Sequence, residues 1–195
     1  MEDITKNEMK FMLTLLKNPN EQYNANNIST ILKISSMGAL KIAKRLQKEN
    51  IFTSKEIGKA TFYKLNLESD YVRQYLKFLL KREAEQASPY VKRWKTEVEK
   101  KLESISIVVI LFGSILTKQK GANDIDLLII IDKKKYNQIN KKIEEINKFS
   151  DKTIHPMYQT KKDFKENLEK EDKPLMSAIK GIVLSGEEQF LELLK

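Results

Sequence analysis

Apolar and polar positions in the first third of the chain follow the two periods that mark helices and strands. Apolar residues recur at i, i+3, i+4 and i+7 from Met9 to Leu16, which predicts an amphipathic helix. Later, two short β-like runs flank Gly58, which permits a tight turn. The predicted elements are helices over 5–17, 25–32 and 36–49, followed by strands over 51–55 and 61–65.

The third predicted helix separates small apolar residues from cations. Ala39, Ala43 and Leu46 fall within one arc of the helix, and four cations fall on the opposite side. Cations on an outward face can neutralise phosphates, and short polar residues at the helix start can reach base edges. A solvated helix face without a ligand has the same pattern, and that alternative stays open. The predicted DNA contacts are Ser35, Ser36, Lys41, Lys44, Arg45 and Lys48, with Lys59 at the tip of the hairpin.

The order helix, helix-turn-helix, hairpin over residues 5–67 resembles the winged-helix domains of the multiple-antibiotic-resistance-regulator and arsenic-repressor types, and we assign residues 1–67 to this domain. The resemblance implies that double-stranded DNA is a partner. A helix over 71–82 has an apolar face wider than one small domain needs to bury. This helix either builds a homodimer, which suits palindromic DNA, or packs on its own or the next domain. We assign 68–88 to a connecting region and expect Pro89 to begin a new helix.

The second half opens with a predicted helix whose apolar stripe includes Trp94, which we interpret as a core anchor. A strand over 105–112 leads directly into Gly113 and Ser114. Gly113 has no Cβ, so a phosphate could approach its backbone closely. Ser114 then begins a short helix over 115–118, whose free amides and hydroxyl would face an anion.

Two carboxylates follow in the next predicted strand. Asp124 and Asp126 are two residues apart, so both side chains leave the same face, while Ile125 and Leu127 point into a core. Two carboxylates on one face are unfavourable unless a cation lies between them. Mg²⁺ or Mn²⁺ ions would meet that need and hold a nucleoside triphosphate. An isolated strand end with solvated acids is the alternative.

The stretch from Gly113 to Leu128 resembles the Gly-Ser-x(9)-Asp-x-Asp motif of the DNA polymerase β-like nucleotidyltransferase superfamily in its minimal form. The segment 177–194 resembles the closing helix, glycine turn and last helix of that family. The resemblance covers residues 89–195. It implies that Gly113 and Ser114 hold the triphosphate, that Asp124 and Asp126 bind metal, and that the domain transfers a nucleoside monophosphate to a hydroxyl.

Active members of that family usually add a third carboxylate from a neighbouring strand. The strand predicted over 152–159 contains no acid, and its corresponding position holds His155, the one histidine of the chain. A neutral imidazole could act as a base or as a metal ligand, and Mg²⁺ prefers oxygen. A histidine with ordinary hydrogen bonds is the alternative, so the sequence leaves catalytic activity open.

Composition fits these interpretations. The net charge of +9 favours a polyanionic partner, and the absence of cysteine excludes disulfides and thiolate metal sites. The start of the chain lacks a signal core and the apolar runs are too short to span a membrane, so a soluble cytoplasmic protein is expected.

The predicted fold class is α+β, with a winged helix-turn-helix followed by an α/β nucleotidyltransferase fold with a small mixed sheet. The leading hypothesis is a DNA-binding regulator with a domain that binds a nucleoside triphosphate with Mg²⁺. The alternatives are a non-catalytic nucleotide sensor or scaffold, and an antitoxin that modifies a toxin protein.

Overall fold

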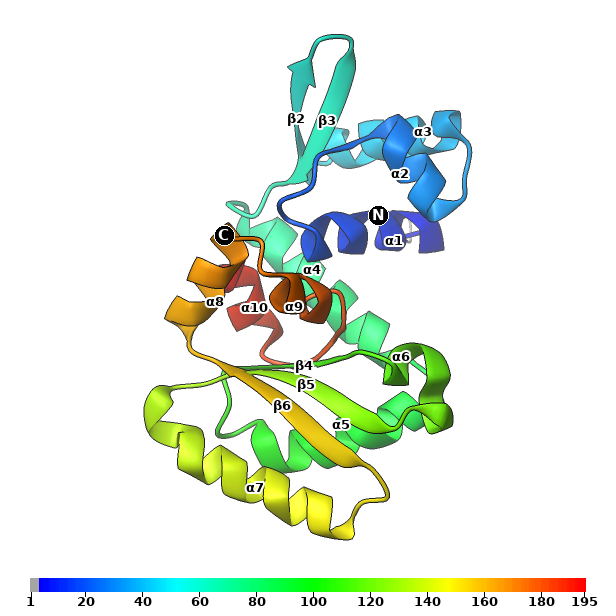
Figure 1. Cartoon of the computed structure of the whole chain (residues 1–195). Helices are drawn as coiled ribbons and strands as arrows, with labels where there is room; N and C mark the ends of the chain where they lie inside the picture. Colours follow the sequence, from blue (N-terminus) through cyan, green and yellow to red (C-terminus); the bar gives the residue numbers. More distant parts are fainter. Residues whose placement is uncertain (1–3) are drawn as a thin grey trace. The chain divides into compact units, whose positions relative to one another are not determined.

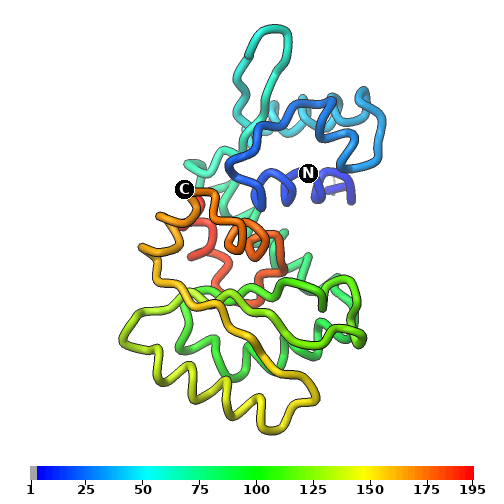
Figure 2. The backbone as a smooth tube through the Cα atoms, in the orientation of Figure 1, coloured from blue at the N-terminus to red at the C-terminus, as the bar shows by residue number. Residues whose placement is uncertain are grey.

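The computed structural model describes residues 4–195, which form two compact units. One unit comprises the chain up to Leu79 together with Leu194–Lys195, and the other comprises Leu80–Leu193. Figures 1 and 2 trace the chain through both units in the colours of the sequence. The boundary falls within a helix, α4, that the sequence assigns to the connecting region.

The amino-terminal unit has the element order of a winged helix. Its three-stranded antiparallel sheet has the order β1-β3-β2, and the β2–β3 hairpin projects from the helices of this unit (Figure 1). The two-residue strand β1 was not predicted, because Tyr23 and Asn24 become a strand only by pairing with β3. The elements are α1 (Lys6–Lys17), β1 (Tyr23–Asn24), α2 (Ala25–Leu32), α3 (Ser36–Lys48), β2 (Phe52–Ile57), β3 (Ala60–Leu65) and α4 (Asp70–Glu85).

Side chains at the helix starts explain why these helices begin where they do. Thr5 and Glu8 form a capping box at α1, with the Thr5 amide donating to Glu8 Oε2 at 2.8 Å. The Ser35 hydroxyl accepts from the Gly38 amide at 3.0 Å and caps α3. Each bond satisfies an amide that has no partner within the helix, so both boundaries are set by local sequence.

The carboxy-terminal unit is built on a four-stranded mixed sheet of order β6-β5-β4-β7. Strands β5 and β6 are parallel, and β4 is antiparallel to both β5 and β7. Figure 1 shows α5 and α7 on one side of the sheet and α8, α9 and α10 on the other. The elements are α5 (Pro89–Leu102), β4 (Val108–Phe112), α6 (Ile115–Lys118), the 3₁₀ turn η1 (Gln119–Gly121), β5 (Asp124–Ile130), the 3₁₀ turn η2 (Lys133–Lys135), α7 (Tyr136–Phe149), β6 (Thr153–Gln159), α8 (Lys161–Glu169), α9 (Lys173–Ala178), β7 (Ile182–Ser185) and α10 (Glu187–Leu193).

Alternation along β5 determines which residues reach the core. Ile125, Leu127 and Ile129 are fully buried in the cluster formed with α5 and α7. Trp94, at 2% exposure, lies in the same cluster, as expected for a core anchor. The opposite face of β5 therefore presents Asp124 and Asp126.

The structure corrects two predicted boundaries. Strand β4 begins at Val108 rather than 105, because the amides of Ile105 and Ser106 both bond to the Leu102 carbonyl and extend the end of α5 as a turn. The glycine turn expected between the two last helices is the strand β7, which pairs with β4. Gly181 permits this pairing, since a Cβ there would clash with the Leu111 carbonyl oxygen.

The structure also corrects the placement of Arg45 on the outward cationic face of α3. Its guanidinium lies 2.8 Å from Glu8 Oε1 on α1 and 3.1 Å from Glu49 Oε1. The Glu8 side chain is only 4% exposed, so Arg45 neutralises a buried carboxylate and ties α3 to α1. Lys44, its neighbour in sequence, is exposed.

Within residues 4–195, no helix has the length and apolar character needed to cross a membrane.

We expect Arg45→Ala to lower the free energy of unfolding by about 2 kcal/mol, because it leaves the buried Glu8 carboxylate without its cation. The matched variant Lys44→Ala removes an exposed cation and should change it by less than about 0.5 kcal/mol. Urea unfolding of both variants measures the difference. Equal effects would contradict a structural role for Arg45.

Candidate functional site

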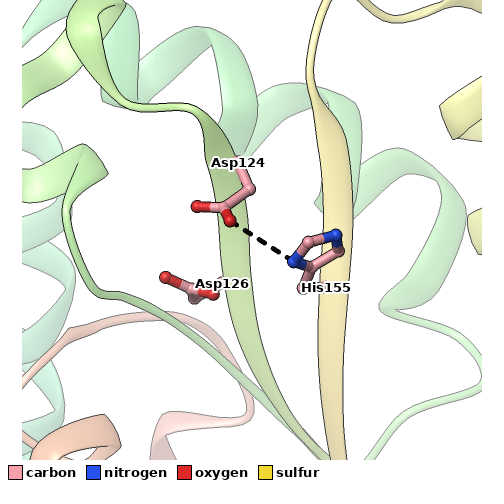
Figure 3. A group of neighbouring side chains, drawn as sticks. All are labelled: Asp124, Asp126 and His155. Carbon is pink, nitrogen blue, oxygen red and sulfur yellow. Dashed lines mark ion pairs between the residues drawn. The ribbon is translucent and has the colours of Figure 1, made fainter.

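Two neighbouring strands bring Asp124, Asp126 and His155 together. In the parallel pairing of β5 with β6, Asp126 lies directly opposite His155 and Asp124 lies opposite Thr153. Paired residues project from the same face of a sheet, so the imidazole joins both carboxylates. Figure 3 shows the His155 ring turned toward Asp124. The structure thus places together the three residues that the sequence identified as a possible metal or catalytic site.

The three side chains are close enough to share one ion. His155 Nδ1 lies 3.4 Å from Asp124 Oδ2, and one ligand atom from each residue lies within 4.8 Å of the others. The His155 side chain is 60% exposed, and Asp124 is its one polar partner among residues 4–195. A structural histidine held by several hydrogen bonds does not fit this environment.

The electrostatics of the site disfavour two unscreened charges. Burial raises the pKa of Asp126, the adjacent charge of Asp124 raises it further, and His155 lowers it in part. A divalent cation would offset both the burial and the repulsion between the carboxylates. Two carboxylates and an imidazole are a donor set that divalent ions accept, with the nitrogen suiting Mn²⁺ or Zn²⁺ better than Mg²⁺. The residues present therefore fit a metal.

Gly113 belongs to the same site through its contact with Asp126. Its φ is +79°, a backbone conformation that favours glycine, and a Cβ at this position would collide with the Asp126 carboxylate. The register explains this proximity, because Phe112 lies opposite Asp126 at the end of β4. The glycine is required both by the turn and by the carboxylate beside it.

Ser114 follows Gly113 and begins the four-residue helix α6. Its carbonyl accepts bonds from the amides of Thr117 and Lys118, at 3.1 and 2.7 Å. Its hydroxyl makes no capping hydrogen bond and is available to a ligand. The predicted pair Gly113-Ser114 thus lies at the turn that adjoins the Asp pair.

Lys152 is a residue of this region that sequence reasoning missed. Its ammonium group donates to the carbonyl oxygens of Lys120 and Ala122, the first at 3.1 Å. These bonds hold the segment that leads into Asp124. The pairing of Asp124 with Thr153 brings Lys152 beside this segment, so the register of β5 and β6 is the signal that could have found it.

The residues predicted to contact DNA lie on α3 and the hairpin. Lys41, Lys44 and Lys48 are exposed on α3, and Lys59 is exposed in the turn between β2 and β3. Ser35 is exposed, and its hydroxyl caps α3. The remaining two predicted residues have other partners: Arg45 pairs with Glu8, and the Ser36 hydroxyl lies 3.2 Å from that of Ser29.

Comparison with known families bears on the carboxy-terminal unit. Residues 96–180 match the family model described as polymerase beta, nucleotidyltransferase. The match begins within α5 at residue 96 and includes the Gly113 turn, the Asp pair and His155. Over these residues the carboxy-terminal unit is similar to the polymerase beta nucleotidyltransferase family. No curated protein matches the chain.

Solved structures that are similar to part of the chain include AdcR and a mutant of ZitR. AdcR, the adhesin competence repressor of Streptococcus pyogenes, is 13% identical, with a TM-score of 0.37, over 51% of this chain and 69% of that one. A mutant of Lactococcus lactis ZitR is 18% identical, with a TM-score of 0.30, over 53% of this chain and 58% of that one, less than two thirds of its length. The winged-helix assignment rests on the element order seen in the amino-terminal unit.

We expect Gly113→Ala to destabilise the protein by about 2 kcal/mol, because alanine is strained at this φ and its Cβ meets the Asp126 carboxylate. The penalty should shrink in an Asp126→Ala background, where the carboxylate is gone. Gly121→Ala is the control, since its Cβ would lie 3.8 Å from the nearest heavy atom, at Lys118. A double-mutant cycle in urea tests the contact, and additive penalties would contradict it.

Proposed function

We propose that the nucleotidyltransferase domain binds a nucleoside triphosphate together with a divalent metal ion at the Asp124 site. The observation that supports this proposal is the convergence of two carboxylates and an imidazole within 4.8 Å. The turn at Gly113 beside them leaves its backbone open to a phosphate, and the match to the nucleotidyltransferase family model makes a nucleotide the expected ligand.

Each residue has a distinct role in this proposal. Asp124, Asp126 and His155 would hold Mg²⁺ or Mn²⁺, and the metal would neutralise charge on the phosphates. Gly113 leaves room for the terminal phosphates beside the backbone, and the Ser114 hydroxyl donates to a phosphate oxygen. The hydrogen bonds from Lys152 to the Lys120 and Ala122 carbonyl oxygens keep the segment before Asp124 in place.

The reaction we propose is transfer of a nucleoside monophosphate to an acceptor hydroxyl. A bond forms between the acceptor oxygen and the α-phosphorus, the bond to pyrophosphate breaks, and the acceptor loses its proton. His155 occupies the position that the family resemblance gives to a third carboxylate. A neutral imidazole there could accept that proton, or could act as a metal ligand alone.

A second candidate is a nucleotide sensor without transferase activity. The observation that favours it is the donor set, which holds two carboxylates rather than three among the described residues. The two candidates share nucleotide binding and differ in pyrophosphate release. Incubation with ATP labelled at the α-phosphate separates them, since only a transferase moves the label to an acceptor.

The same protein would bind double-stranded DNA through α3 and the hairpin. Lys41, Lys44 and Lys48 offer exposed cations along α3, and Lys59 offers one at the hairpin tip. We propose that these lysines contact phosphates, with Ser35 at the start of α3. The exposed Tyr71 and Phe78 of α4, at 47% and 53% exposure, are the surface we propose for a homodimer.

For the nucleotide site, we expect Asp124→Ala/Asp126→Ala to abolish Mn²⁺-dependent ATP binding measured by titration calorimetry. The matched control Glu169→Ala/Glu171→Ala removes two exposed carboxylates elsewhere in the domain and should bind as the wild type does. Unchanged binding by the aspartate variant, or absence of binding by the wild type, would reject this site.

For the DNA surface, we expect Lys41→Glu/Lys44→Glu to weaken binding to a random-sequence duplex. The slope of log affinity against log salt should become shallower by about 2, because each lost phosphate contact removes about 0.9 of slope. Fluorescence anisotropy over a salt series measures both quantities. Lys6→Glu/Lys10→Glu changes charge equally on α1, and an equal loss in that control would show that net charge alone governs binding.

A further inference from the structure

A pocket lies at the opposite end of the sheet from the metal site. Strands β5 and β6 run parallel, and their carboxyl ends lead through η2 into α7 and through Thr160 into α8. Figure 1 shows both connections at one end of the sheet, with α6 at the other end. A pocket of about 640 Å³ opens here, which lies within the range of small-molecule sites. Adjacent parallel strands commonly bind ligands at their carboxyl ends.

The pocket carries an excess of positive charge. Lys133, Lys134 and Lys162 line it, and the first two have no ion-pair partner within the described part of the chain. Asp163 also lines it, but its carboxylate is engaged in the capping box of α8, accepting from the Thr160 hydroxyl at 2.7 Å. These hydrogen bonds from Thr160 hold the pKa of Asp163 below its usual range. Lys162 also pairs with Glu166, its Nζ 3.6 Å from Oε1, so Lys133 and Lys134 carry the unpaired positive charge that favours an anionic ligand.

The start of α7 adds to this preference. The helix begins at Tyr136 in the pocket wall and has no acidic residue in its first turn. The turn η2 before it is capped by Asp132, whose carboxylate accepts from the Lys134 amide at 3.0 Å. The amides at the start of a fourteen-residue helix carry partial positive charge. The lysines and this helix start therefore act on the same space.

A buried polar group without a partner also lines the pocket. Gln159 is only 7% exposed, and its Oε1 has no hydrogen-bond partner. Its Nε2 has only a weak contact, 4.0 Å from the Met157 sulfur. Buried amides are normally satisfied, and this Oε1 has almost no accessible surface, so the carboxamide must turn toward the pocket before a ligand can supply the missing partner.

Two tyrosines provide an aromatic wall. The rings of Tyr136 and Tyr158 meet edge to face, with centroids 4.9 Å apart. Tyr136 is 44% exposed, so its ring remains accessible for stacking. Tyr158 is held in place by a hydrogen bond from its hydroxyl to Asn140 Oδ1 at 3.3 Å. A planar ring in the ligand would stack on the exposed Tyr136 ring.

We propose that this pocket is a second ligand site, which binds a small phosphorylated molecule with a planar ring, of the nucleotide class. The lysines and the α7 start receive the phosphate, Gln159 bonds to the polar part, and Tyr136 stacks on the ring. Seven residue steps separate Asp124, at the start of β5, from Ile131, just after its end, which is about 23 Å of extended chain, so the site is separate from the metal site.

The test is binding of ADP, titrated by fluorescence with a labelled analogue in the presence of EDTA, which removes any contribution of the metal site. Saturable binding is expected. Lys133→Ala/Lys134→Ala should weaken it by about tenfold or more. Tyr136→Ala should weaken ADP binding while leaving competition by inorganic phosphate unchanged. Lys141→Ala/Lys148→Ala removes two exposed lysines from α7 and should have no effect.

The aspartate variant distinguishes ADP binding in this pocket from nucleotide binding at the metal site. Asp124→Ala/Asp126→Ala should keep ADP binding in EDTA even though it loses Mn²⁺-dependent ATP binding. Lack of saturable binding would overturn the proposal. An equal loss in the Lys141→Ala/Lys148→Ala control, or loss in the aspartate variant, would overturn it as well.

Discussion

Burial of Ile125, Leu127 and Ile129 against α5 and α7 fixes the orientation of β5, and the functional geometry depends on that orientation. Because side chains alternate along a strand, the same burial directs Asp124 and Asp126 to the other face. A shift of one residue would place the carboxylates in the apolar core, at a prohibitive desolvation cost. The hydrophobic core thus maintains the position of the charged site.

The two neighbours of β5 complete the site from opposite sides. Parallel pairing with β6 sets His155 opposite Asp126, and antiparallel pairing with β4 ends at the Gly113 turn. The clash predicted for any Cβ at Gly113 shows how closely turn and carboxylate pack. One strand therefore organises residues that are more than forty positions apart in the sequence. The carboxyl end of the same strand leads to the lysine-rich pocket.

The parts of this arrangement encoded locally were predictable from the sequence. The Asp-x-Asp spacing and the turn at Gly113 each involve residues within a few positions of one another, so pattern and residue type suffice. Arg45 could not be assigned correctly, because its partner Glu8 lies on a different helix. The role of Lys152 and the strand β7 were missed for the same reason. Lys152 bonds to a loop distant in the sequence, and β7 forms by pairing with β4, and no local pattern encodes either contact.

The central claim is that Asp124, Asp126 and His155 form one metal site. Pulsed electron paramagnetic resonance of the protein loaded with Mn²⁺ tests it directly, because a coordinating imidazole nitrogen produces a characteristic modulation. We expect this nitrogen signal in the wild type and its loss in His155→Ala. Bound Mn²⁺ that lacks the nitrogen signal, or a signal that persists in His155→Ala, would contradict it.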